Sequence, residues 1–127
     1  YGHTTAGTIS YASQHGRGVY IGDWFFFEFE IFLSSIDVAM AGQLRMSGFP
    51  TSAANDGLDV SHAVGLYQSL TPSADEDHVT IFTNPNSATF TFYSMGSGGL
   101  SAINAATEVG GTMGLFGSGF LRYEGAH

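Results

Sequence analysis

Two glutamates in one predicted strand are the residues of this chain best suited to acid–base chemistry. Glu28 and Glu30 lie two positions apart within residues 20–33, which read YIGDWFFFEFEIFL. In a strand, this spacing places both carboxylates on one face with their Cα atoms about 7 Å apart. Carboxyl groups separated by about 5 to 9.5 Å can hydrolyse a glycosidic bond. The alternative, which we favour, is a solvated or subunit-facing strand surface on which Arg45 or Arg122 pairs with these carboxylates.

The densest set of oxygen donors in the sequence is the run Asp75, Glu76, Asp77 and His78. Calcium prefers oxygen ligands, but this run lacks the spaced Asp-x-Asp-x-Asp-Gly pattern of an EF-hand loop. We therefore predict an exposed acidic turn. Asn55, Asp56 and Asp59 form a second set within residues 51–59, and this polar segment is also expected to be a surface loop.

Other common catalytic and ligand-binding patterns are absent from the sequence. There is no cysteine, the five histidines lack metal-ligand spacing such as His-x-x-x-His, and no Gly-x-Ser-x-Gly motif occurs. The glycine runs are not followed by the lysine and helix of a phosphate-binding loop. The sequence therefore predicts no catalytic residue, no metal site and no cofactor, and we expect that the protein is not an enzyme.

Three aromatic residues with polar groups are the ones that we expect nearest to a binding interface, namely Trp24, Tyr67 and Tyr93. Tryptophan and tyrosine supply a large contact area at low entropic cost, both for sugar stacking and for protein interfaces. The alternative for each is packing at the periphery of the core. Together with Asn55, Asp56, Asp75 and Asp77, they form the set of candidate binding residues.

The alternation of residues 24–33 predicts the strand that must position the two glutamates. A period of two with aromatic and β-branched residues is typical of a strand with one buried face. The face predicted to be buried carries Phe25, Phe27, Phe29, Ile31 and Leu33. The opposite face is half apolar, with Trp24, Phe26 and Phe32 beside the glutamates. This composition suggests a sheet that packs inward and also contacts something on its outer side.

Eight or nine short strands are expected in total, separated by clusters of glycine, asparagine, aspartate and serine. They are residues 8–11, 18–21, 24–33, 43–47, 60–70, 79–83, 88–94, 112–116 and 120–123. A short helix over residues 37–46 is an alternative for one segment. Strands at this spacing without amphipathic helices predict an all-β fold, an antiparallel β-sandwich of jelly-roll-like type.

Composition and charge exclude several classes of function. A chain of 127 residues is expected to be a single β-sandwich domain over residues 1–127. It has no lysine, three arginines and a formal net charge of −8. Nucleic-acid binding needs a basic surface, so we expect neither nucleic acid nor an anionic membrane as a partner. No apolar run reaches the roughly 20 residues that span a bilayer. Because the chain begins with Tyr1, we expect part of a longer or processed polypeptide.

Four motifs follow one another in a fixed order along the chain. They are Tyr20-Ile21-Gly22-Asp23 before the aromatic strand, the pair Ser34-Ser35, the segment Ser47-Gly48-Phe49-Pro50, and the glycine-punctuated segment Gly117-Ser118-Gly119-Phe120-Leu121-Arg122-Tyr123. This ordered series resembles the terminal β-domains of bacteriophage tail fibres and related virion appendage proteins. Phe49 departs from the leucine of the family pattern, and residues 51–86 match no part of it. The resemblance implies a jelly-roll-like domain that assembles as a homotrimer on a virion.

These observations predict a structural and binding domain of a bacteriophage virion, either a tail-fibre tip or a head decoration. The expected partners are two further copies of the chain and other virion proteins, with a host-surface glycan as a further candidate. The alternative is a carbohydrate-binding module of a secreted enzyme. A glycosidase that uses Glu28 and Glu30 is a weaker alternative.

Overall fold

The computed structural model describes residues 1–50, 60–72, 76–83, 86–97 and 99–123. In these residues the chain forms eight strands, all pairs are antiparallel, and no helix occurs. The strands are β1 (Thr8–Ile21), β2 (Trp24–Val38), β3 (Arg45–Met46), β4 (Val60–Leu70), β5 (Glu76–Thr83), β6 (Phe90–Gly96), β7 (Gly99–Ala102) and β8 (Val109–Arg122). The predicted all-β antiparallel fold is confirmed.

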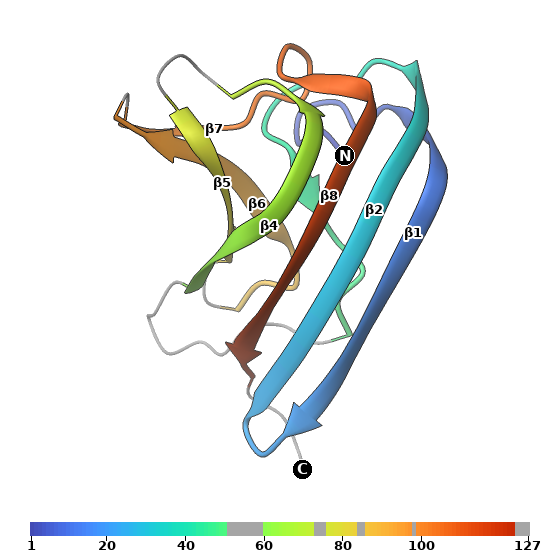
Figure 1. The fold of residues 1–127 in the computed structure, drawn as a ribbon. Helices are drawn as coiled ribbons and strands as arrows, with labels where there is room; N and C mark the ends of the chain where they lie inside the picture. Colours follow the sequence, from blue (N-terminus) through green and yellow to red (C-terminus); the bar gives the residue numbers. More distant parts are fainter. Residues whose placement is uncertain (51–59, 73–75, 84–85, 98, 124–127) are drawn as a thin grey trace.

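Strand β4 connects two layers of a sandwich. The strand order is β1-β2-β8-β4-β5-β6-β3, and β7 pairs with β6. The first part of β4 pairs with β5, whereas its later part pairs with β8, so the sheet folds over along this strand. Figure 1 shows the long strands β1, β2 and β8 side by side, and β4 curving away from them toward β5, β6 and β7. We call the layer of β1, β2 and β8 the long layer.

The core lies between the two layers and is rich in phenylalanine. From β2, the buried residues are Phe25, Phe27, Phe29 and Leu33, while Ile31 is half-buried. The ring of Phe27 lies 5.2 Å from that of Phe90 on β6 and 5.0 Å from that of Phe49, between ring centroids. The inner face predicted for residues 24–33 is therefore confirmed, and it joins the long layer to the opposite one.

Two predicted pairs of short strands are single long strands. Residues 8–11 and 18–21 belong to β1, and residues 112–116 and 120–123 fall within or at the end of β8. The glycines between them had indicated turns, but they lie inside the strands. In contrast, the strand predicted over residues 43–47 contracts to Arg45–Met46, although Leu44 and Met46 are buried as the alternation predicts.

Glycines of β8 lie where phenylalanine rings of β2 need space. Gly117 pairs with Phe29, and a Cβ atom on Gly117 would lie 2.6 Å from the Phe29 ring. Gly114 pairs with Phe32, and a Cβ atom there would overlap the Phe32 ring. Glycine is accepted within a strand where another group approaches the backbone closely. The aromatic strand therefore explains why its neighbour is rich in glycine.

The alternative helix over residues 37–46 is wrong. The segment is held by bridges to the N-terminal residues, because Thr5 pairs with Ala41 and Gly2 with Leu44. The backbone N–H of Ala41 donates to the Thr5 carbonyl at 3.0 Å, and Gly42 has a φ of 83°, which a helix does not allow. These bridges satisfy the backbone without a helical turn.

Asp37 joins the two strands of the β1–β2 hairpin at the end opposite its turn. Its carboxylate accepts hydrogen bonds from Ser10 Oγ at 2.7 Å and from Ser35 Oγ at 2.8 Å. These two hydroxyl donors lower the pKa of Asp37 below its ordinary value.

Candidate functional site

An exposed apolar surface covers one end of the outer side of the long layer, and we call it the outer patch. Its residues are Val19, Ile21, Trp24, Phe26 and Phe120, with exposed fractions of 40% to 59%. Antiparallel pairing places them together, since Ile21 pairs with Trp24, Val19 with Phe26, and Phe26 with Phe120. The Phe120 ring lies 5.5 Å from that of Trp24 and 5.8 Å from that of Phe26. Three strands thus supply one contiguous surface.

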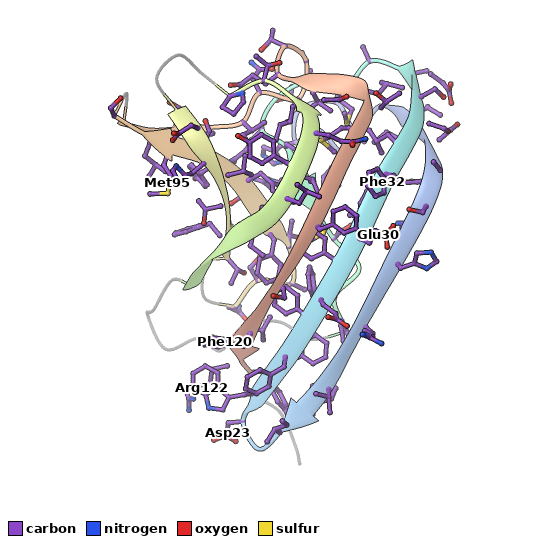
Figure 2. The ribbon with its side chains drawn as sticks, viewed as in Figure 1. Asp23, Glu30, Phe32, Met95, Phe120 and Arg122 are labelled. Carbon is purple, nitrogen blue, oxygen red and sulfur yellow. The ribbon has the colours of Figure 1, made fainter. Side chains whose placement is uncertain are left out.

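Charged residues of both signs surround the outer patch. Arg17 and Glu28 face each other across the β1–β2 pair and form an ion pair. Arg122 pairs in register with Trp24, and Asp23 lies in the turn that precedes β2. Figure 2 shows Asp23, Phe120 and Arg122 at the same end of the long strands. The border of the patch is therefore polar and mixed in sign.

Next to the outer patch, the long layer has an open hollow of about 690 Å³ that contains both glutamates. Its side-chain lining includes His15, Arg17, Glu28, Glu30, Phe116 and Ser118. Gly65 and Gly117 also border it and leave backbone accessible there. Glu28 and Glu30 lie on the same outer face, as the sequence predicts, and Ser13 Oγ donates to Glu30 at 3.1 Å.

The partner predicted for the glutamates is wrong. Arg17, rather than Arg45 or Arg122, binds Glu28, because the hairpin register places Arg17 directly opposite it. Arg45 pairs instead with Thr91 in the other layer. Arg17 was missed because residues 8–21 and 24–33 were not predicted to form one hairpin. The turn signal Gly22-Asp23 between them could have revealed this pairing.

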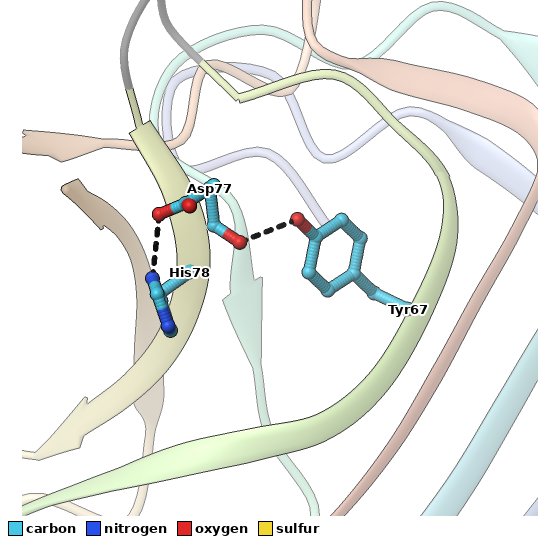
Figure 3. A network of polar contacts seen from close by, with 3 residues as sticks. All are labelled: Tyr67, Asp77 and His78. Carbon is cyan, nitrogen blue, oxygen red and sulfur yellow. Dashed lines mark hydrogen bonds and ion pairs between the residues drawn. The ribbon is translucent and has the colours of Figure 1, made fainter.

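A separate polar contact joins β4 to the start of β5 (Figure 3). The Tyr67 hydroxyl donates to the backbone carbonyl of Asp77 at 2.9 Å. Asp77 Oδ1 and His78 Nδ1 are 2.6 Å apart, and both side chains are exposed. The predicted binding residues Tyr67 and Asp77 are thus in contact, in an arrangement that orders a strand start.

Two other predicted binding residues, Trp24 and Tyr93, lie elsewhere in the fold. Trp24 belongs to the outer patch, whereas Tyr93 is half-buried on β6 with its ring 5.6 Å from that of Phe82. Asn55, Asp56 and Asp75 lie outside the described residues. The described candidates therefore lie in three separate parts of the fold. Within the described parts of the chain, no group of three or more His, Asp or Glu side chains could hold a metal ion.

A second cleft, of about 640 Å³, opens between the inner side of β1 and residues 44–50. Its lining includes Tyr11, Tyr20, Met40, Met46 and Phe49. Gly16 and Gly18 of β1 also border it, so the strand contributes little side-chain volume there. The cleft is a gap between the two layers near the edge strand.

Replacing Tyr67 with phenylalanine is expected to lower the free energy of unfolding by about 0.5 to 1.5 kcal/mol, since one hydrogen bond is lost while the ring packing stays. The exposed position of this bond favours the lower end of that range. Urea unfolding of the two proteins measures the difference. Among the described residues, the Tyr11 hydroxyl on β1 has no such carbonyl contact, so a matched Tyr11→Phe variant should unfold like the original chain. Equal loss in both variants would contradict a role for the Asp77 contact.

The described residues thus form an all-β sandwich that exposes a contiguous apolar surface on its long layer. The described part of the chain contains no helix with the length and apolarity needed to cross a membrane. No protein-family model and no curated protein sequence matches the chain.

In solved structures the fold does have a counterpart. It is similar to part of the Dettilon tailspike protein (gp208), known from its crystal structure, with a TM-score of 0.75 and 19% sequence identity. The match covers 94% of this chain and 22% of that one, so the chain spans about a fifth of the tailspike. This likeness shows that the two share a fold.

Proposed function

We infer that the chain is a structural and binding domain of a bacteriophage virion, jelly-roll-like in fold, at a tail-fibre tip or on the head. It acts without catalysis, assembles as a homotrimer and contacts other virion proteins. The outer patch carries this proposal, because a monomeric soluble domain seldom exposes so contiguous a set of large apolar side chains. The fold shared with part of a tailspike protein supports the same role.

The surroundings of the two glutamates support a role without catalysis. Glu28 is bound by Arg17 and Glu30 by Ser13, both from the neighbouring strand of the same hairpin. These contacts stabilise the sheet surface, as in other cross-strand pairs of opposite charge. The hollow is also open, whereas a glycosidase encloses its sugar between an acid and a second carboxylate.

Measurement of molar mass in solution tests the assembly. The 127-residue chain should give three times its protomer mass of 13.4 kDa by light scattering, and the proportion of trimer should fall on dilution. A protein that stays monomeric at every concentration and is absent from purified phage particles would overturn the proposed function.

A carbohydrate-binding module is the second candidate, and the hollow beside the outer patch favours it. Carboxylates, a serine hydroxyl and the Phe116 ring border this hollow, and such groups can bind sugar hydroxyls and stack on a sugar ring. A monomer that binds polysaccharide, with the binding weakened in a Glu30→Gln variant, would favour this candidate. Polysaccharide hydrolysis that disappears in Glu28→Gln would instead favour the glycosidase.

A further inference from the structure

The outer patch extends to the free edge of the long layer. Among the described residues, strand β1 stands at one end of the strand order and pairs only with β2, and it supplies Val19 and Ile21 to the patch. The register of β1 with β2 is regular over residues 13–21, and these residues include neither proline nor lysine. Natural edge strands are commonly protected from pairing by bulges, proline or lysine. Residues 18–21 of this edge, next to the apolar surface, have no bulge, no proline and no charged side chain.

The charges around the outer patch determine which partner fits it. Arg17, Arg122, Asp23 and Glu28 border the patch, so its border is neutral in sum. These are two of the three arginines and two of the eleven acidic residues in the chain. The net charge of −8 therefore resides in the remaining residues. Copies of this chain repel one another over most of their surface, but not here.

On the basis of the virion function proposed above, we propose that the outer patch is the contact surface between copies of this chain. Contact at this surface removes Val19, Trp24 and Phe120 from water without bringing unbalanced charge together. The bordering arginines and carboxylates of one copy can face those of the next, as interfaces with complementary charges do. A saccharide fits this surface less well, because the side chains of the five patch residues offer only one polar group, the indole N–H of Trp24.

The chain carries its own probe for this contact. Trp24 is the single tryptophan of the sequence and is 40% exposed within the outer patch. Its fluorescence emission should move to longer wavelength as dilution separates the copies and water reaches the indole. Dissociation seen by light scattering without any change in this emission would overturn the proposal.

A pair of matched variants gives the second test. Val19→Glu places a carboxylate in the patch at a position that is 54% exposed, so the protomer should still fold. Leu100→Glu is the control, since Leu100 is 64% exposed on β7, in the other layer. Burying an unpaired charge at an interface is costly, so Val19→Glu should weaken association about 100-fold or more. Leu100→Glu should leave association within a few-fold of the original chain.

The outcomes separate this inference from the proposed function. If the original chain and Val19→Glu form the same oligomer with equal dissociation, the outer patch is not the contact, and the virion role can stand with another surface. If Leu100→Glu also dissociates, general charge repulsion explains the effect and the inference is wrong. If Val19→Glu dissociates but its circular dichroism melting curve matches that of the original protomer, the dissociation comes from loss of the contact and not from unfolding. That result supports the proposal.

Discussion

Replacing Phe27 with alanine is expected to lower the free energy of unfolding by about 3 to 5 kcal/mol, as for other buried phenylalanines. Phe27 is 6% exposed and contacts Phe49 and Phe90, so it links the long layer to the opposite one. Removing its ring leaves a cavity between layers that the surrounding strands cannot close. Domains of this size are stable by about 5 to 15 kcal/mol, so this loss removes a large part of the stability and should lower the melting temperature by many degrees.

Phe26→Ala is the matched control for this prediction. Phe26 is the same residue type, one position earlier in β2, but its side chain lies on the outer face and is 40% exposed. Its loss should cost about 0.5 to 1.5 kcal/mol, mainly the ring contact with Phe120. Thermal and urea unfolding at low protein concentration measures both variants without a contribution from association. An unchanged melting temperature for Phe27→Ala would show that the inner face of β2 is assigned wrongly.

The two faces of β2 explain why the fold could be predicted from the sequence. Alternation over residues 24–33 separates the buried phenylalanines from Phe26 and the glutamates, and only an extended strand gives that separation. Burial of one face then requires a second layer, which the other short apolar segments supply. The structure confirms both the buried face of β2 and the core that this face forms with the second layer.

The lengths of β1 and β8 could not be predicted in the same way. Glycine in a sequence indicates a turn or a bulge by its local conformational freedom. In this protein, Gly114 and Gly117 lie under phenylalanine rings that are far away in the chain. Only the register of β8 with β2 shows that these glycines leave space for the rings, and no local sequence pattern indicates this register. A similar limit applies to Leu66, because the register shift between Val64 and Leu66 interrupts the alternation of β4 and leaves Leu66 exposed while Val64 is buried.

The candidate site was predicted in part for the same reason. The half-apolar outer face of residues 24–33 indicated an outward contact and included Trp24. Val19 and Phe120 come from two other strands, and only the pairing of β1 and β8 with β2 brings them beside it. Tyr93 was selected for its residue type alone, and its contact with Phe82 places it at the periphery of the other layer.

Two glycines of β1 provide a direct test of where the phenylalanine rings of β2 lie. Gly16 and Gly18 are two positions apart on β1, and each pairs with a buried phenylalanine of β2, Phe29 and Phe27 respectively. A Cβ atom on Gly18 would lie 2.7 Å from the Phe26 carbonyl oxygen and would overlap the ring of Phe25. A Cβ atom on Gly16 would lie 3.8 Å from the Glu28 carbonyl oxygen, an ordinary contact.

Gly18→Ala is therefore expected to lower the free energy of unfolding by about 1 to 3 kcal/mol, because a backbone atom and a buried ring must both move. Gly16→Ala should raise it by up to about 1 kcal/mol, since alanine loses less conformational freedom than glycine in a strand. Urea unfolding of both variants measures the two changes on the same scale. If both variants were stabilised, the ring of Phe25 would not lie over Gly18. The hairpin would then pair in another register, and the outer patch built on that pairing would lose Val19 and Ile21.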